Sequence, residues 1–319
     1  MNEEPQLLLS RSFSSFEELA ATVVAWDLDF RQISRASSES TLVQIQAGET
    51  LLTHLTCDCF SRHAGATPEN TYTIAVPDIG CSEFRYSNRL ISRPAMIITG
   101  PGQEFELLPR PGYAITTFSV SRAVIDRFFE SDLDHSLDHL LKPSDGLVFV
   151  DTEAVMKVQE YTRKLYMLAH VPGASPGTFI PDHSLESELL ESILDALFQG
   201  NPASNELKGR ARCRVLNQAM DYALCHQDVP LKVSDLVFAA QTTERTLERA
   251  FRQGLGMTPK QYLLGLRMSG VHHRLWCSSG PETSVSAIAN EWGFWHMGQF
   301  AKDYRRLFGE LPSTTLRKH

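Results

Sequence analysis

The sequence predicts an α+β fold in which a β-rich N-terminal part precedes helices and an all-α C-terminal part. Three observations predict it. Between residues 30 and 120, short β-like runs alternate with Pro and Gly, a spacing typical of a sandwich or small barrel. From Ser121 onward, apolar residues recur with the helical period. With 319 residues, the chain also exceeds the size at which single hydrophobic cores stop growing, so we expect two or more domains.

The predicted elements follow in chain order. A short helix at 15–25 precedes six β-like runs, at 30–34, 41–46, 50–57, 72–76, 95–99 and 113–120. Helical periodicity then covers 123–129, 152–169 and 184–198, before a linker rich in Gly, Pro, Ser and Asn at 199–207. The last part is predicted to be helical throughout, at 210–226, 232–240, 243–254, 259–277, 284–292 and 296–308.

Charge is divided unevenly along the chain. Hydrophobic residues make up 42% and charged residues 21%, an ordinary globular balance, and the formal net charge is −8. Residues 209–319 hold 15 Lys and Arg against 9 Asp and Glu, a net of +6, whereas the other 208 residues hold 15 against 29, a net of −14. A basic end on an acidic body indicates a polyanion-binding module, although charge also varies between domains for solubility.

Membrane, metal and cofactor functions find little support in the sequence. No apolar run reaches the length of a membrane span, and residues 1–6 are acidic where a secretory signal would be basic. We therefore expect a cytoplasmic protein with no membrane association and with reduced cysteines. Cys57 and Cys59, with His54 and His63 nearby, could suggest a metal site. Packed thiols on one face of a strand are the simpler interpretation, so we expect no metal and no cofactor.

The C-terminal part repeats itself with an offset of 52 to 53 residues. The matching pairs are Val233 with Val285, Ser234 with Ser286, Leu236 with Ile288, Leu247 with Phe300, Phe251 with Tyr304, Gly256 with Gly309, and Pro259 with Pro312. Each copy reads as a short amphipathic helix, a tight turn and a second helix that stops at a Gly, with a Pro three positions later. The second copy has one extra residue between its helices.

The second helix of each copy pairs an apolar face with a basic face. Apolar residues four positions apart are expected to pack inward while basic residues project outward. The outward residues are Arg245, Arg249 and Arg252 in one copy and Lys302, Arg305 and Arg306 in the other. Arg can bond guanine and phosphate alike in a major groove. A helical bundle with a merely solvated outer face is the alternative, and two basic copies in register favour DNA binding over it.

Residues 214–316 resemble the AraC/XylS regulators. The resemblance rests on the connector 259–275 with Arg267 inside it, on the run 287–294, and on the spacing of Phe300, Tyr304, Phe308, Gly309 and Pro312. The layout and the run 294–300 are similar to a subgroup that includes the ethanolamine-operon regulator, whose ligand we do not carry over. The family's fold implies seven helices in two helix-turn-helix units. It also implies two recognition helices about one DNA turn, roughly 34 Å, apart on one face of double-stranded DNA.

The resemblance also implies DNA-contacting positions. In this sequence they are Thr243, Arg245, Glu248, Arg249 and Arg252 in the first unit and Met297, Gly298, Gln299, Lys302 and Arg306 in the second. Arg249 would reach guanine, and Glu248 could accept from a cytosine amino group. His296 stands where Ser or Asp commonly caps the second helix, and Gly298 lies in its first turn, so we expect a weaker, more backbone-directed second contact. Trp292 and Phe294 are expected in the core rather than stacked on bases.

The N-terminal half resembles the family's cupin-like effector domains more loosely, through the run 96–102 before Phe105. The implied organisation is a cupin-like effector barrel at 1–120, a helical dimerisation region and linker at 121–200, and a tandem helix-turn-helix domain at 209–319. A stripe of Leu185, Leu189, Ile193 and Leu197 predicts a homodimer through these helices. The sequence does not identify effector-binding residues, and a packed barrel without a ligand is the alternative.

The predicted function is sequence-specific regulation of transcription, with double-stranded DNA and RNA polymerase as partners and a small-molecule effector. One alternative is a DNA-binding regulator without a small ligand, controlled by a partner protein or by abundance. A metal-dependent cupin enzyme is less favoured. The sequence has no G-x-S-x-G elbow, phosphate-binding loop, H-E-x-x-H motif or G-x-G-x-x-G motif, so we expect no enzymatic activity.

Overall fold

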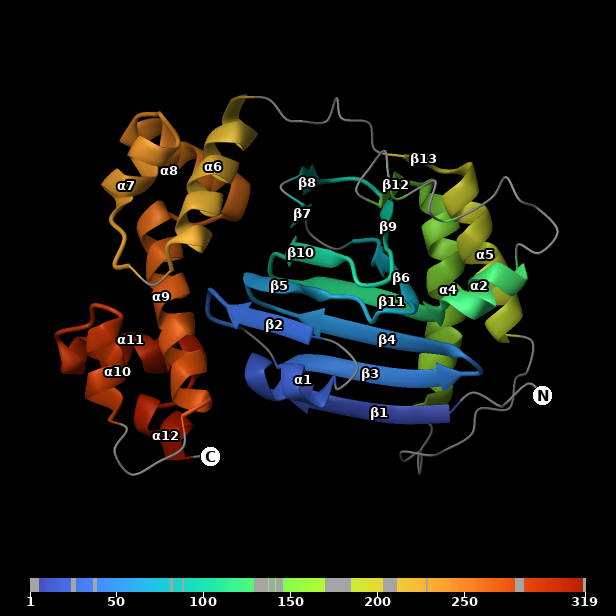
Figure 1. Cartoon of the computed structure of the whole chain (residues 1–319), viewed down its shortest axis with the longest axis horizontal. Coiled ribbons are helices and arrows are strands. Elements are labelled where there is room, and N and C mark those ends of the chain that lie inside the picture. The colour runs from blue at the N-terminus through green and yellow to red at the C-terminus, as the bar shows by residue number, and fades with distance from the viewer. Residues whose placement is uncertain are drawn as a thin grey trace.

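A computed structural model describes residues 6–23, 27–36, 39–80, 83–87, 89–128, 137, 141, 146–169, 185–202, 211–227, 229–278 and 284–317. Most of the predicted linker, at 203–207, lies outside the described residues. The part that contains the sheets lies between two groups of helices (Figure 1). The α+β fold expected from the sequence is therefore confirmed in its elements, sheets first and helices last.

Eight strands form the larger of two antiparallel sheets. In spatial order they are β1 (Gln6–Phe13), β3 (Ser40–Ala47), β4 (Thr50–Cys57), β11 (Tyr113–Ser121), β6 (Thr71–Pro77), β9 (Ala95–Thr99), β12 (Leu147–Phe149) and β13 (Asn201–Pro202). The central strands are long and regular, with eight paired positions between β11 and β4. Both faces of this sheet are largely buried, because strands at its centre bury consecutive residues.

Five strands form the second sheet. In spatial order they are β2 (Asp27–Gln32), β5 (Ser61–Ala66), β10 (Glu104–Leu108), β7 (Phe84–Tyr86) and β8 (Arg89–Ile91). A shared apolar core lies between the two sheets, with Leu42, Leu55 and Ile115 from the larger sheet and Phe84 and Leu107 from the smaller. The two sheets thus pack face to face.

The predicted cupin-like barrel is not confirmed in the described residues. The strand ladders end at β1 and β13 in one sheet and at β2 and β8 in the other, and the two sheets remain unjoined. A closed barrel requires each strand to pair with two neighbours. Alternating sequence patterns report which face of a strand is buried but not whether a sheet closes, which is why the sequence could not distinguish the two architectures.

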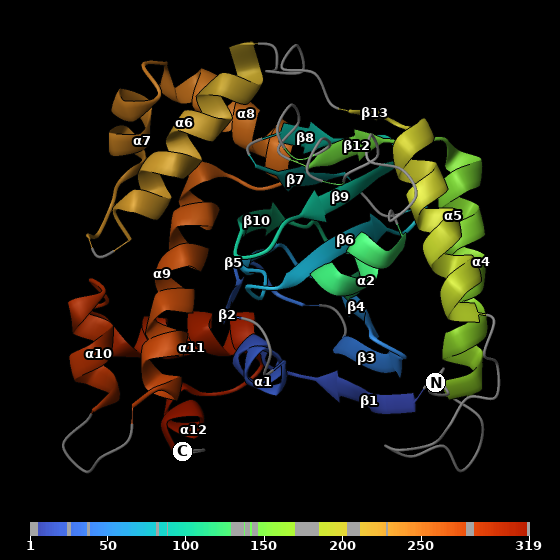
Figure 2. The same cartoon turned by 45° about the vertical axis from the view of Figure 1, so that its right-hand side comes forward.

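Helices cover the outer face of the larger sheet. They are α2 (Arg122–Phe128), α4 (Thr152–Ala169) and α5 (Leu185–Gln199), on the opposite side from the C-terminal helices (Figure 2). Leu189, Ile193 and Leu197 of α5 are 2%, 0% and 0% exposed within the chain, in one core with the sheet. These three residues of the apolar stripe assigned to a dimer interface are therefore covered by the chain's own sheet and by α4; the Leu185 side chain lies outside the described residues.

Seven helices follow among the described residues after 210. They are α6 (Ala211–Cys225), α7 (Val233–Ala239), α8 (Glu244–Leu255), α9 (Pro259–Trp276), α10 (Val285–Glu291), α11 (Met297–Phe308) and α12 (Pro312–Arg317). One core joins α6, α7 and α8 to the first half of α9, and a second core joins the end of α9 to α10, α11 and α12. The long helix α9 thus connects two packed groups (Figure 1).

The described residues outside the C-terminal helices give little support for a metal site or a membrane span. The described residues hold no group of three or more His, Cys, Asp and Glu side chains close enough to share a metal ion. Cys57 and Cys59 are both buried, and burial raises the pKa of the Cys59 thiol well above its ordinary value. His54 instead shares a hydrogen bond of 3.1 Å with the Thr116 hydroxyl. No helix within the described ranges is long and apolar enough to cross a membrane.

Candidate nucleic-acid interface

The sequence repeat corresponds to two helix pairs with matching local geometry. In the first pair, α7 ends at Ala239, and α8 begins after a turn of four residues in which the Thr243 hydroxyl accepts from the backbone of Thr246 at 3.3 Å. In the second pair, α10 ends at Glu291, and α11 begins after five residues. The second helices stop at Gly256 and Gly309, which have φ of +71° and +79°. Each predicted stop signal is confirmed.

The turns also match in their backbone. Gln241 in the first turn has φ of +46°, and Gly293, 52 residues later, has φ of +77°. Both lie in the left-handed region, where Gly is unstrained and most other residues are not. The backbone of the first turn is therefore strained at Gln241, which the sequence did not indicate. The second turn avoids this strain because Gly293 occupies the matching position.

The second helix of each pair buries its apolar row and exposes its basic row. Leu247 and Phe251 of α8 are both 0% exposed, and Phe300 and Tyr304 of α11 are 2% and 0% exposed. The outward residues predicted from the repeat, namely Arg245, Arg249, Arg252, Lys302, Arg305 and Arg306, are all exposed. This places a positively charged surface on the outer face of both helices.

The DNA-contacting residues predicted in α8 differ in whether their side chains already form an ion pair. Arg245 and Arg249 are exposed and form no ion pair with the described residues. Glu248 and Arg252 instead pair with each other at 2.9 Å across one helical turn. Because this pair is solvent-exposed, breaking it to contact a base or a phosphate costs little. Thr243 is exposed, and its hydroxyl serves as the helix cap.

In α11, Asp303, which the sequence did not point to, contacts two of the predicted DNA-contacting residues. The Asp303 carboxylate accepts from the Gln299 amide at 2.9 Å and pairs with the Arg306 guanidinium at 2.9 Å. Its spacing of four and three residues from these partners is the signal that could have identified it. Lys302 is exposed, and it forms no ion pair within the described part of the chain.

The N-terminal end of α11 lacks a side-chain cap, as expected from its sequence. His296 gives the helix no side-chain cap, and Gly298 is exposed with open space around the position of a Cβ atom. Trp292 and Phe294 pack in the adjacent core, where a Cβ on Gly270 would lie 2.1 Å from the Trp292 ring. Trp295, in contrast, is 71% exposed beside the start of α11, an aromatic surface that the sequence left unassigned.

The N-terminal sheets hold the far ends of both basic helices. Arg110, between β10 and β11, donates to the backbone carbonyls of Gln253, at 3.1 Å, and Gly254 at the C-terminal end of α8. Gln32 at the end of β2 donates at 2.8 Å to the carbonyl of Leu307 in α11. These side chains complement carbonyls that a helix leaves without internal partners. The contacts leave the N-terminal halves of α8 and α11 exposed.

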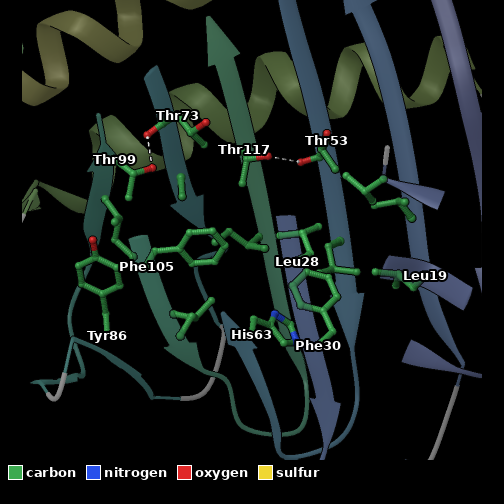
Figure 3. A pocket seen from close by; sticks show the side chains of 17 residues that line it. Leu19, Leu28, Phe30, Thr53, His63, Thr73, Tyr86, Thr99, Phe105 and Thr117 are labelled. Atoms are coloured by element: carbon green, nitrogen blue, oxygen red, sulfur yellow. Dashed lines mark hydrogen bonds between the residues drawn. The ribbon is translucent and has the colours of Figure 1, made fainter. Parts of the chain in front are cut away.

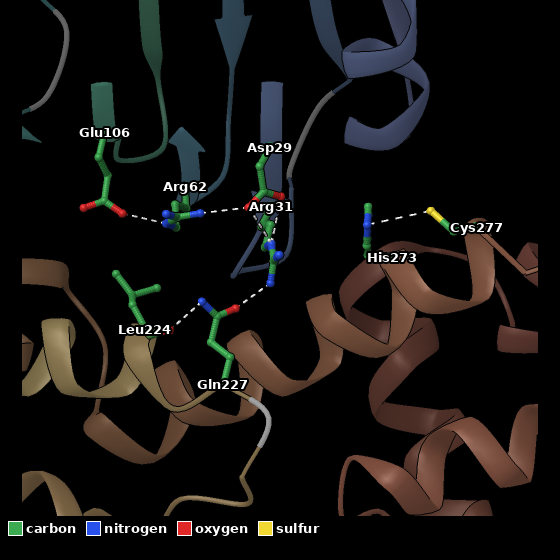
Figure 4. Close-up of polar contacts among 8 residues, drawn as sticks. All are labelled: Asp29, Arg31, Arg62, Glu106, Leu224, Gln227, His273 and Cys277. Atoms are coloured by element: carbon green, nitrogen blue, oxygen red, sulfur yellow. Dashed lines mark hydrogen bonds and ion pairs between the residues drawn. The ribbon is translucent and has the colours of Figure 1, made fainter. Parts of the chain in front are cut away.

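Further polar contacts fix the smaller sheet against α6. Arg31 of β2 donates to the Gln227 side chain, whose amide in turn donates to the Leu224 carbonyl at 2.9 Å (Figure 4). Asp29 lies between Arg31 and Arg62, at 2.9 Å from each, and these guanidiniums hold the pKa of its carboxyl below the ordinary value although burial acts to raise it. The sheet and the helices therefore meet through ordered side chains.

A buried ion pair joins the helix α1 (Phe16–Thr22), beside the sheets, to the second helix group. Glu17 lies 3.0 Å from Nε2 of His272 in α9, and their side chains are 8% and 4% exposed. Burial acts to raise the pKa of the Glu17 carboxyl, but the hydrogen bond and charge of His272 outweigh it, so the pKa lies below its ordinary value. Sequence patterns gave no signal for this pair because its members are 255 positions apart.

The remaining nitrogen of His272 begins a chain of hydrogen bonds. Nδ1 lies 2.5 Å from the Tyr304 hydroxyl, which lies 2.8 Å from the Thr315 hydroxyl, and Thr315 donates to the Glu310 carboxylate at 2.7 Å. The single proton of Thr315 is used by Glu310, so Thr315 accepts from Tyr304, and Tyr304 accepts from Nδ1. Both ring nitrogens of His272 then donate, Nε2 to the Glu17 carboxylate and Nδ1 to the Tyr304 hydroxyl.

Comparisons with known proteins match part of the chain. Residues 236–318 match the family model described as a helix-turn-helix domain. The chain is 34% identical over 103 residues to the probable thc operon regulatory protein of Rhodococcus erythropolis, covering 32% of this chain and 31% of that one. It is 36% identical over 88 residues to the XylDLEGF operon transcriptional activator of Pseudomonas putida, covering 28% and 27%.

A solved structure aligns over a third of the chain. It is that of a probable AraC family transcriptional regulator from Rhodopseudomonas palustris, with 31% identity over 33% of this chain and 95% of that chain, at a TM-score of 0.31. The match spans about a third of the length of the curated relatives, which are named as transcription regulators and not as enzymes. Through its C-terminal helix-turn-helix region, the chain belongs to the AraC/XylS family of DNA-binding transcription regulators.

Proposed function

We propose that the chain regulates transcription by reading a specific DNA sequence through two helix-turn-helix units, α7–α8 and α10–α11. The observation that carries this proposal is the pairing of the two units: matched stops, matched buried rows and an exposed basic face on each second helix. A single basic helix is common on protein surfaces. Two such helices repeated on one connector suit successive major grooves of one duplex.

The two helices contribute differently in this proposal. Arg245 and Arg249 of α8 are the base-reading residues, because both are exposed and neither forms an ion pair with the described residues. Glu248, Arg252 and Thr243 support them. In α11, Met297, Gly298, Gln299 and Lys302 meet the groove, and Arg306 meets phosphate. The uncapped start of α11 favours a contact directed more to the backbone than to bases.

Selection of DNA from a randomised duplex library by the full-length protein tests this function. We expect enriched duplexes with two short conserved segments, the one read by α8 more strongly defined. Binding should weaken steeply with salt, because the exposed arginines and lysines displace counterions from phosphates. Recovery of no preferred sequence after repeated rounds would remove the claim of specific reading.

The domain organisation is part of the proposal. Residues 1–120 would form the regulatory part, 121–200 a helical region, and 209–319 the DNA-binding part, with RNA polymerase as the partner on DNA. Support comes from the ordered contacts of Arg110 and Gln32 with the ends of α8 and α11, which give the N-terminal part a route to influence DNA binding. Regulation by a partner protein or by abundance, without a small ligand, is the alternative.

We also propose a homodimer, through a different surface from the buried stripe of α5. Met156 and Met167 of α4 are 59% and 64% exposed and lie eleven positions apart, on one side of the helix. Sedimentation of the full-length protein is expected to give the mass of two chains, and Met156→Glu with Met167→Glu is expected to give that of one. A single-chain mass for the unaltered protein would contradict the dimer.

A further inference from the structure

A cavity of about 110 Å³ lies between the two sheets, bounded on one side by α1. Its wall from the larger sheet is built from alternate positions of neighbouring strands, Thr53 and Leu55 in β4, Ile115 and Thr117 in β11, and Ala75 in β6. Alternate residues of a strand face the same side, so these side chains all point toward the smaller sheet. Thr53, Ala75 and Thr117 retain exposed surface although their strands are central, because the cavity lies against them.

The cavity has a hydrocarbon body and one polar end. Leu28 and Phe30 of β2 and Phe105 of β10 line the body, whereas Thr53, Thr73, Thr99 and Thr117 gather at one end (Figure 3). The Thr99 and Thr117 hydroxyls make only long hydrogen bonds, 3.4 Å and 3.5 Å, to backbone carbonyls of Thr73 and Thr53. Bonds of this length are weak, so a closer polar atom could redirect either hydroxyl.

None of the 17 lining residues supplies a charge. They include no Lys, Arg, Asp or Glu. His63, which is 3% exposed, shares a hydrogen bond of 3.0 Å with Ser61 through Nε2, and its Nδ1 has no hydrogen-bond partner within the described part of the chain. Burial lowers the pKa of His63 to about 3, so its ring is neutral near pH 7. A carboxylate or an ammonium placed here would be desolvated without a partner.

We infer that this cavity binds an uncharged, mainly hydrocarbon molecule of about one ring in size, with a single hydroxyl or carbonyl group at the threonine end. The size follows from the volume: about 110 Å³ is of the same order as the apolar cavity of about 150 Å³ that holds benzene, so the cavity has room for about one ring. The inference rests on the proposed regulatory role of the N-terminal part and names the chemical class of its ligand. It excludes organic acids, amines and sugars as ligands of this cavity.

Calorimetric titration of the full-length protein with benzyl alcohol, toluene and benzoate at about pH 7.5 tests the class. Benzyl alcohol and toluene are expected to bind with one site per chain, and benzoate at least about tenfold more weakly, because its charge would be unpaired. Thr117→Val should lower the affinity for benzyl alcohol about three- to tenfold and leave the affinity for toluene unchanged, since only the alcohol can bond to the Thr117 hydroxyl.

Two matched substitutions locate the binding. Ala75→Leu fills the cavity from β6 and is expected to abolish binding of both neutral probes, whereas Ala123→Leu on the exposed face of α2 should leave it intact. The inference is overturned if benzoate binds as well as benzyl alcohol, if binding survives Ala75→Leu, or if neither neutral probe binds. DNA binding by the same preparations, without any probe, separates this result from the proposed function. Loss of DNA binding with intact binding of neutral probes would count against the function alone.

Discussion

Replacing Glu17 with Gln is expected to lower the free energy of unfolding by about 3 to 5 kcal/mol, the usual cost of removing one partner from a buried ion pair. The loss is large because His272, 4% exposed, would lose its ion-pair partner and keep only the Tyr304 hydroxyl of the two partners of its ring nitrogens described above. Chemical denaturation of the full-length protein measures it. Glu18→Gln is the matched control, because Glu18 pairs with Arg11 at the surface and should contribute only about 0 to 1 kcal/mol.

The same pair predicts the direction of a pH effect. The pKa of Glu17 is lowered in the folded chain from its ordinary value of 4.5. Its contribution to stability is therefore complete above that value and is lost as the pH falls through the lower, folded-state pKa. The stability difference between the unaltered protein and Glu17→Gln should shrink on acidification from about pH 6 to about pH 3. Equal losses for Glu17→Gln and Glu18→Gln at pH 6 would show that the buried pair of Glu17 and His272 stabilises the fold no more than a surface ion pair does.

Helix α1 connects the ion pair of Glu17 and His272 to the cavity between the sheets. Leu19 of α1 lines the cavity between the sheets, two residues from Glu17, which holds α9. Because α1 is only seven residues long, a shift of Leu19 by a bound molecule would move Glu17 as well. Glu17→Gln is therefore expected to weaken the effect of a cavity ligand on DNA affinity.

The second large effect is expected at Arg249. Arg249→Ala should cost about 1 to 3 kcal/mol on the preferred duplex, roughly 5- to 150-fold in affinity, and should relax the preference at one base pair. The reason is that Arg249 lies on the outer face of α8, opposite the buried Leu247 and Phe251, with no ion pair among the described residues to give up. Titrations on preferred and scrambled duplexes measure both quantities.

Arg306→Ala provides the contrasting case. Arg306 near the end of α11 is paired with Asp303 and is expected to contact phosphate, so its loss should weaken all duplexes alike and reduce the salt slope by about one unit. Arg127→Ala, an exposed arginine of α2 paired with Glu49, should change neither measurement. If Arg249→Ala lowered the affinity for preferred and scrambled duplexes equally, the proposal that Arg249 reads a base would be wrong.

Local features of the DNA-binding region could be predicted from the sequence because they depend on neighbouring residues. The stops at Gly256 and Gly309 and the buried rows of α8 and α11 follow from helical periodicity and from glycine's freedom in the left-handed region. The missing cap at His296 is local for the same reason.

Features that depend on distant contacts could not be predicted. Periodicity marked the apolar stripe of α5 but not its partner, and the partner is the chain's own sheet rather than a second copy. Strand patterns likewise could not show that two sheets form without closing into a barrel. Glu17 and His272 carried no signal because neither stands in a motif, and their meeting depends on how the sheets dock against α9.

The central claim, that α8 and α11 occupy successive major grooves of one duplex, is tested most directly by hydroxyl-radical footprinting of the full-length protein on its selected DNA. The claim predicts, for each bound chain, two protected segments centred about 10 base pairs apart on one face of the helix. In Arg249→Ala, protection should fade first in the segment contacted by α8. One protected segment only, or two at a spacing that places them on opposite faces, would contradict it.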